Sequence, residues 1–276
     1  MFIPFGFMKS PAGAPAYDTD AQAFFTAVAG GGDTLTTTEK DATNQFVLDL
    51  KSAGIWTGMD LIYPFVGGTS TSTKWNLKDP QDTDAAFRIT WQNPGGGTFD
   101  ANGVKGDGGS FAGNTHLVPS TVFNSNPRHL SAYANLADAG SSYDMGSNKS
   151  GGNKNVIIIE YGNNTSYCGF GGFITTANAS GVGQVIGTYD AGASPKVNLY
   201  LNGSSANTGN TTNLDEDTPM GIFCDNRSSV TGGFSPNEFT ERRLATITMG
   251  DILNGTEASD LYDATQTFNT SLSRQV

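Results

Sequence analysis

The chain has 276 residues and a formal net charge of −11 at pH 7. Its 37% hydrophobic and 11% aromatic residues exclude a largely disordered protein, and its length allows one main domain with a full hydrophobic core. The acidic balance would repel a phosphate backbone, so we expect no nucleic-acid partner. Charged residues make up only 15% of the chain and glycine fills 36 positions, a composition typical of a turn-rich β protein.

The chain opens with the apolar segment MFIPFGFM, which has no basic residue before it and is interrupted by proline. We therefore interpret residues 1–17 as an N-terminal arm rather than a signal peptide. Elsewhere no apolar run approaches the roughly 18 residues that a membrane-spanning helix requires. We expect a soluble chain that does not insert into membranes.

Residues 18–58 are predicted to form a helical hairpin. Asp18 can cap a first helix, in which apolar residues recur at helical spacing. Thr36 and Glu39 form a capping box for a second helix, and Gly54 is suited to end it.

From residue 61 onward the pattern changes to short β-branched or aromatic runs that are separated by Gly, Asn, Pro and Ser. The best runs are 61–66, 86–91, 129–135, 156–161, 168–175, 185–189, 197–201, 220–224 and 244–249. Their number and spacing predict an antiparallel β-sandwich over residues 59–276. Asn202-Gly203 follows an alternating run and predicts a type I′ hairpin turn.

A closing helix is predicted over residues 254–273. Asn254 and Glu257 form a capping pair at its start, and an apolar stripe follows at helical spacing. We expect this helix to pack on the sandwich or beside the N-terminal helices.

Two long segments resemble a known group of proteins: DLKSAGIWTGMDLIYPFVGGTSTSTKWNLKDPQDTDAAF near the N-terminus and ATITMGDILNGTEASDLYDATQTFNTSLSRQV at the C-terminus. Together they resemble structural proteins of tailed bacteriophages with a concanavalin A-like, laminin-G-type sandwich (a jelly roll) between a helical start and a closing helix. The sequence departs from that group at TMGDILNGTEA, where relatives carry a Gly-Asp-Gly-Leu-Thr-Asp-type lead into the last helix.

The resemblance implies a virion component, such as a tail, fibre or head-decoration protein, assembled in the host cytoplasm and exposed on the particle. Its expected partners are other virion proteins, bound through the N-terminal arm and helices, and further copies of itself. The group supplies no catalytic residues that can be transferred to this sequence. The alternative hypothesis is a carbohydrate-binding adhesin or a glycan-cleaving enzyme acting on host-surface polysaccharide.

Glycoside hydrolysis needs two carboxylates across a cleft, about 5 Å apart in retaining enzymes. No predicted strand carries the alternating acidic residues that such enzymes typically use. The nearest acidic group, Asp215-Glu216-Asp217, precedes Pro219 and is interpreted as a solvated turn. We therefore predict no catalytic residues and a protein that is not an enzyme.

Metal binding is also weakly supported. The segment from Asp100 to Asp107 resembles the opening of a calcium loop, but Lys105 stands where the next ligand is required. His116 and His129 are the only histidines and have no partner at zinc-ligand spacing. We expect no metal and no cofactor, with calcium as the weaker alternative to a polar loop.

The three tryptophans, Trp56, Trp75 and Trp91, are candidate platforms for stacking a sugar ring, but packing is the favoured interpretation, so the carbohydrate-binding residues stay unknown. Cys168 and Cys224 lie in apolar, strand-like segments. We expect two buried free thiols, with a single bridge between them as the alternative.

Overall fold

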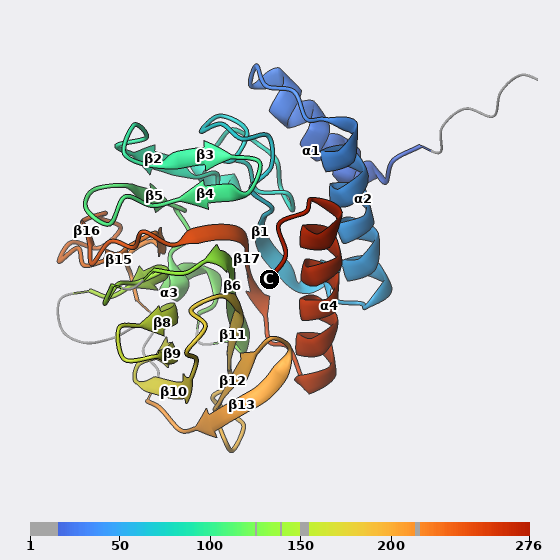
Figure 1. Cartoon of the computed structure of the whole chain (residues 1–276). Helices are drawn as coiled ribbons and strands as arrows, with labels where there is room; N and C mark the ends of the chain where they lie inside the picture. The colour runs from blue at the N-terminus through green and yellow to red at the C-terminus, as the bar shows by residue number, and fades with distance from the viewer. Residues whose placement is uncertain (1–15, 125, 139, 150–154, 213–215) are drawn as a thin grey trace, which may run out of the picture.

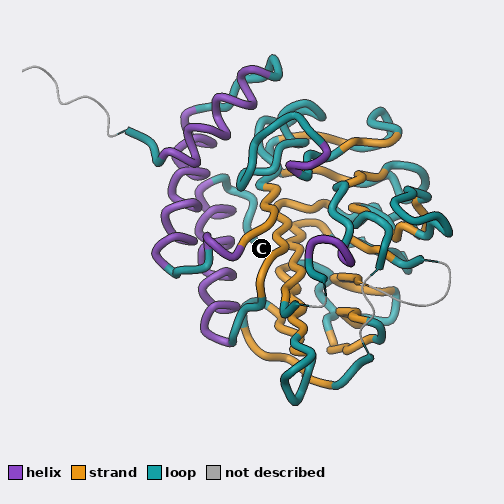
Figure 2. The backbone as a smooth tube through the Cα atoms, turned by 180° about the vertical axis from the view of Figure 1, so that it is seen from behind, coloured by secondary structure: helices purple, strands orange, loops and turns teal. Residues whose placement is uncertain are grey.

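The computed structural model describes residues 16–124, 126–138, 140–149, 155–212 and 216–276, so most of the predicted arm lies outside the described residues. Two β-sheets pack face to face, and the three long helices lie together on one side of them (Figures 1 and 2). The helical elements are α1 (Thr19–Gly30), α2 (Thr37–Ser52), η1 (Trp56–Gly58), η2 (Asp84–Ala86), α3 (Pro119–Val122) and α4 (Gly255–Ser271).

The first sheet has the strand order β13-β12-β11-β6-β17-β4-β3, and β1 also pairs with β17. Its strands are β1 (Met59–Tyr63), β3 (Thr98–Asp100), β4 (Gly103–Lys105), β6 (Arg128–Leu136), β11 (Gly183–Tyr189), β12 (Val197–Leu201), β13 (Ser204–Gly209) and β17 (Arg243–Asp251). The long neighbours β6 and β17 form its centre, and their pairing extends over most of their length.

The second sheet has the order β10-β9-β8-β7-β14-β5-β2. Its strands are β2 (Thr90–Gln92), β5 (Ala112–Asn114), β7 (Met145–Ser147), β8 (Asn155–Tyr161), β9 (Thr165–Phe170), β10 (Phe173–Ala177), β14 (Gly221–Ile222), β15 (Asp225–Asn226) and β16 (Pro236–Asn237). Among the described strands only β15 and β7 pair in parallel; the other pairs are antiparallel.

The space between the sheets holds the main hydrophobic core. Strand alternation places Ile157 and Ile159 of β8, and Cys168 and Phe170 of β9, in this core. Each fully buried side chain of this size contributes roughly 1.5–3 kcal/mol. Because alternate residues point the other way, this packing also decides which residues of β8 and β9 face outward.

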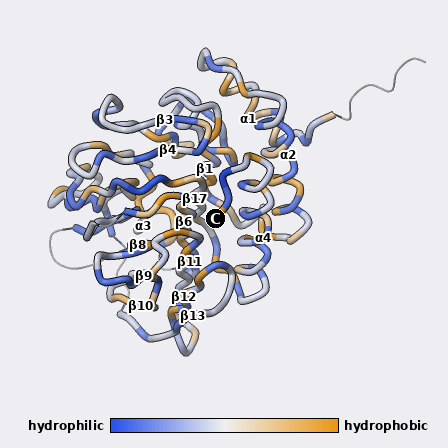
Figure 3. The backbone as a smooth tube through the Cα atoms, in the orientation of Figure 1, coloured by the Kyte–Doolittle hydropathy of each residue, from blue (hydrophilic) through white to orange (hydrophobic). Residues whose placement is uncertain are grey.

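A second hydrophobic cluster joins the helices to the outer face of the first sheet. Ile186 and Tyr200 point out of the sheet into this layer, where the Phe46 and Phe268 rings of α2 and α4 stack with centroids 4.9 Å apart. Apolar residues recur along α1, α2 and α4 (Figure 3). The outer face of the first sheet is therefore covered.

The structure confirms the predicted mainly β, antiparallel sandwich with an N-terminal helical hairpin and a C-terminal helix. The expected caps are also present: Asp18 accepts a hydrogen bond from the backbone of Asp20, and Thr36 with Glu39 forms a capping box. Asn254 and Glu257 form a second capping box at the start of α4.

Two predicted strands are wrong. Residues 86–91 contain the end of η2 and a left-handed Phe87, so only the start of β2 falls in that range. Residues 168–175 are a hairpin rather than one strand, because Gly171, at φ +76°, turns the chain between β9 and β10. The short strands β3, β4, β5, β7, β13, β15 and β16 fall in none of the predicted runs, whereas β14 lies within the predicted run 220–224.

The predicted hairpin turn at Asn202-Gly203 is confirmed, since both residues have positive φ and Leu201 pairs with Ser204. Cys168 and Cys224 are free and buried, as expected. Burial raises the pKa of the Cys168 thiol to about 12, so it packs as an unreactive apolar group.

The Asn254 cap offers a direct test of the helical layer. Asn254 accepts hydrogen bonds from the backbone of Thr256 and Glu257, so Asn254→Ala should lower the free energy of unfolding by about 1 kcal/mol. Urea denaturation followed by circular dichroism measures the change. Asn254→Ser keeps a capping oxygen and should lose much less; equal losses in the two variants would contradict the capping role.

Candidate functional site

The outer face of the second sheet carries a group of aromatic side chains that we call the aromatic row: Tyr143, Tyr161, Tyr167 and Phe173. Tyr167 faces outward because its neighbour in β9, Cys168, faces the core. The rings of Tyr161 and Tyr167 meet edge to face at 5.8 Å, and those of Tyr167 and Phe173 at 5.5 Å. Phe173 is 37% exposed, so the row reaches the surface.

Val156 and Ile158 form the base beneath this row, because they point outward from β8. Tyr143, the most buried member of the row, lies under the guanidinium of Arg227, whose carbon is 5.7 Å from the ring centre. The Tyr167 hydroxyl accepts a hydrogen bond from the Asn163 amide at 2.9 Å. These contacts hold the row in one arrangement.

Two surface hollows lie where β8 ends and the chain enters the loops at that end of the sandwich. The first hollow, of about 430 Å³, is lined by Ala137, Asp138, Glu160, Gly162, Asn164, Ala179, Ser180 and Gly181. The second hollow, of about 400 Å³, is lined by Gly108, Asp138, Gly140, Ser141, Ser142, Glu238, Phe239 and Glu241. Asp138 lines both hollows. In the sequence, Tyr161 lies between two residues of the first hollow, and Tyr143 directly follows a residue of the second hollow.

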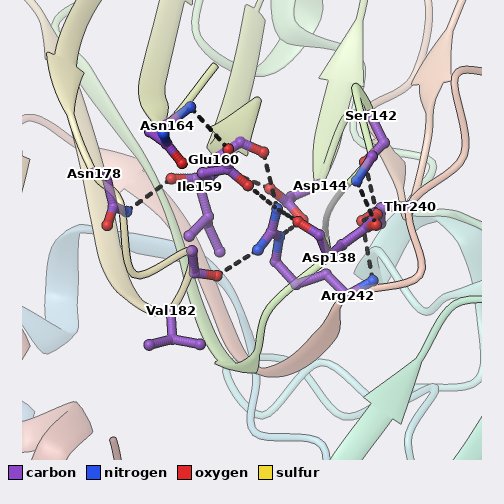
Figure 4. A network of polar contacts seen from close by, with 12 residues as sticks. Asp138, Ser142, Asp144, Ile159, Glu160, Asn164, Asn178, Val182, Thr240 and Arg242 are labelled. Atoms are coloured by element: carbon purple, nitrogen blue, oxygen red, sulfur yellow. Dashed lines mark hydrogen bonds and ion pairs between the residues drawn. The ribbon is translucent and has the colours of Figure 1, made fainter. Parts of the chain in front are cut away.

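A buried arginine, Arg242, donates hydrogen bonds to backbone carbonyls of residues that line the first hollow (Figure 4). Arg242 is 0% exposed, and its Nε donates to Asp144 Oδ1 at 2.9 Å. Its Nη2 donates to the Glu160 backbone carbonyl at 2.8 Å, and its Nη1 donates to the carbonyl of Gly181. One side chain thus joins the start of β17 to β8 and to the loop before β11.

The carboxylates around Arg242 are held by further hydrogen bonds. Asp144 is 1% exposed and its second oxygen accepts from the Ile159 backbone at 2.6 Å; burial nevertheless raises its pKa. Burial would also raise the pKa of Asp138, but hydrogen bonds from the backbones of Glu241 and Gly140 and from two hydroxyl groups lower it. Asp144 thus holds Arg242 and the backbone of β8 in place, and Asp138 holds the backbones of Gly140 and Glu241.

This arrangement differs from what glycoside hydrolysis requires. An acid and a base must face the scissile bond across an open cleft, whereas Asp144 is enclosed and both its oxygens are engaged within the protein. Glu160 Oε1 accepts from the Asn164 backbone at 3.0 Å, and its Oε2 lies 3.8 Å from Arg242 Nη2. The geometry is suited to holding the hollows in shape.

The tryptophans lie away from this face and pack as expected. Trp56 and Trp75 are buried in the helical layer, and lysine ammonium groups lie over both rings. Trp91 stacks on Phe111 at 5.1 Å and its indole N–H donates to the carbonyl of Ser70. None of the three forms an open platform.

The candidate metal residues are also committed to internal contacts. Asp100 forms an ion pair with Arg243 at 2.9 Å, and Asp107 Oδ1 accepts three backbone N–H groups. His129 is buried and its Nδ1 lies 2.6 Å from the carbonyl oxygen of Asp251; burial lowers its pKa to about 4. His116 Nε2 lies 2.8 Å from the Thr90 hydroxyl.

Within the described ranges, no group of three or more His, Cys, Asp or Glu side chains is placed to hold a metal ion. No described helix is long and apolar enough to cross a membrane.

The interpretation of Asp215-Glu216-Asp217 as a solvated turn is wrong for Glu216. This residue is 1% exposed, and its carboxylate accepts a hydrogen bond from the Lys149 backbone at 2.8 Å. Burial raises its pKa to about 7. Asp217 is half-buried and pairs with Lys149 Nζ at 2.6 Å, while Asp215 lies outside the described residues.

The aromatic row is not among the sites predicted from the sequence. Its signal was the alternation in residues 165–170, where Tyr167 is followed by the core residues Cys168 and Phe170. Because residues 168–175 were assigned to a single strand, the outward positions of β9 and β10 were not separated from the inward ones. Arg242, adjacent to a second arginine, gave no sequence signal of burial.

No protein-family model and no curated protein matches this sequence. Solved structures with a similar fold include a mutant sialidase of Trypanosoma rangeli that displays trans-sialidase activity, at 13% identity and a TM-score of 0.47. This match covers 82% of the present chain but only 39% of the sialidase.

Domain 4 of AbnA, a GH43 extracellular arabinanase from Geobacillus stearothermophilus solved with arabinotriose, matches at 14% identity and a TM-score of 0.48, over 74% of this chain and 98% of that domain. The binding domain of botulinum neurotoxin serotype D/C matches at 12% identity and 0.49, over 76% and 53%. None of these three is a bacteriophage protein, and such distant similarity concerns the fold alone.

The Arg242 contacts predict a specific stability effect. Arg242→Met would leave Asp144 buried without its countercharge, and the free energy of unfolding should fall by about 3–5 kcal/mol at pH 7. The folded-state pKa of Asp144 would then rise further above its unfolded value. The loss should therefore shrink as pH falls toward 4, where the carboxyl takes up a proton.

Denaturant unfolding at pH 4, 5.5 and 7 measures this effect. The double variant Arg242→Met, Asp144→Asn removes the buried charge and should recover part of the stability at pH 7. A loss that is independent of pH, with no recovery in the double variant, would contradict the ion-pair role.

Proposed function

We propose that this chain is a non-catalytic virion protein of a tailed bacteriophage, and that its sandwich binds glycans through the aromatic row and the adjoining hollows. The observation that carries the glycan part is the outward-facing aromatic row on the second sheet, in which Phe173 is 37% exposed and Tyr161 and Tyr167 are half-buried.

The row has the chemistry that sugar recognition needs. Aromatic faces pack against the C–H surface of a sugar ring, and a tyrosine adds a hydroxyl that can form a hydrogen bond. The lining of the first hollow includes Asn164 and Ser180, and its residues Glu160 and Gly162 flank Tyr161 of the row in the sequence. The volume of this hollow, about 430 Å³, is in the range of small-ligand sites.

We propose binding without hydrolysis because the carboxylates that surround Arg242 are engaged within the protein. Asp144 is enclosed and its two oxygens hold Arg242 and β8, so it has no free position from which to act on a glycosidic bond. We therefore assign these carboxylates to shaping the hollows.

The virion role rests on the resemblance of the two terminal segments to bacteriophage structural proteins. It agrees with an architecture in which α1, α2 and α4 lie on one side, and the strands β8, β9 and β10, near or on which the aromatic row lies, are on the other (Figure 1). In this arrangement the helical side attaches to the particle, and the aromatic row is presented to the host surface.

Glycan binding is tested with the full chain on a glycan array. Wild-type protein should bind a limited set of glycans, and Tyr167→Ala and Phe173→Ala should each weaken binding about tenfold, since losing one stacking aromatic costs on the order of 1 kcal/mol or more. Leu48→Ala is the matched control, because Leu48 on α2 is 40% exposed and lies in the helical layer. Absence of binding, or equal loss in the control, would overturn this role.

The virion role has its own test. Mass spectrometry of purified particles should detect the chain at a stoichiometry that fits a symmetric assembly. An antibody against an epitope tag at the C-terminus would then locate it by electron microscopy. Purified particles without the chain would refute the assignment.

A further inference from the structure

The charge around the hollows is strongly one-sided. Four carboxylate side chains line them: Asp138, Glu160, Glu238 and Glu241. Among the described residues, the cationic side chains paired with these four are Lys105, Arg227 and Arg242, and none of the three lines a hollow. Acidic groups are therefore in excess where a ligand would lie.

The cations are also poorly placed to meet an anion. Arg242 is fully buried and its donors are directed to Asp144 and to backbone carbonyls. Arg227 is shared between Asp225, at 2.8 Å, and Glu238, at 3.2 Å. No lysine or arginine lines either hollow, within the part of the chain that the structure describes.

The lining instead offers oxygen acceptors and small polar groups. Asn164, Ser180, Ser141 and Ser142 supply amide and hydroxyl groups that suit sugar hydroxyls. Carboxylates in a partly desolvated hollow attract ammonium groups and repel other carboxylates, because the effective dielectric constant there is far below that of water.

From this charge distribution we infer that the site selects uncharged or amine-bearing sugars and rejects glycans built from uronic acid, sialic acid or phosphorylated residues. This inference rests on the proposed glycan-binding function and names its ligand class. The selection arises from repulsion by the acidic lining, while the aromatic row supplies attraction that is common to all sugar rings.

An array that carries neutral, amine-bearing and acidic glycans tests the selection with the wild-type chain and Tyr167→Ala. Hits should fall in the neutral and amine-bearing classes, with acidic glycans of the same backbone about tenfold weaker or more. Raising the salt concentration should narrow this gap, because screening weakens the repulsion.

A charge-reversal variant sharpens the test. Glu241 lines the second hollow and its side chain is 61% exposed, so Glu241→Lys should improve binding of acidic glycans without disturbing the fold. Asp263→Lys, at an exposed position of α4, changes the net charge equally and is the matched control. Equal effects of the two variants would mean that only overall charge matters and would overturn the inference.

The remaining outcomes separate the two proposals. Hits dominated by acidic glycans that are lost in Tyr167→Ala would overturn the selectivity and leave the glycan-binding function standing. No hit in any class would overturn the function, and the selectivity with it.

Discussion

The end of the sandwich that carries the hollows depends on one buried guanidinium. Arg242 has no access to water, so its donors must be satisfied within the protein or the structure loses several kcal/mol. They are satisfied only when Asp144, the end of β8 and the carbonyl of Gly181 converge on it. The same convergence sets the walls of the first hollow and the position of Tyr161, the residue after Glu160 in β8.

At the opposite end of the sandwich, another buried arginine is stabilised in a different way. Arg128, at the other end of β6, is also fully buried, but its guanidinium carbon lies within 5.4 Å of the ring centres of Phe123, Phe170 and Tyr189. Aromatic faces stabilise a cation without providing an acidic surface.

The helices and the long strands were predictable because their signals are local. Capping boxes such as Thr36 with Glu39, and the Asn202-Gly203 turn, specify backbone geometry within four residues. The short strands β5 and β7 have weak signals of their own and exist because each pairs with distant segments. Glu216 was misjudged for the same reason, since its burial depends on the Lys149 backbone, 67 residues away.

The candidate site could not be predicted from the sequence because it depends on contacts between residues that lie far apart in the chain. Aromatic residues at 143, 161, 167 and 173 become one surface only after β7, β8, β9 and β10 are in register. The pairing that aligns them is fixed from the inside, where Ile157 and Cys168 are partners in the core. A one-residue slip would turn Tyr167 inward and Cys168 outward. The sandwich core therefore determines the binding surface as well as the stability, and the helical layer, by covering the first sheet, leaves the second sheet as the open one.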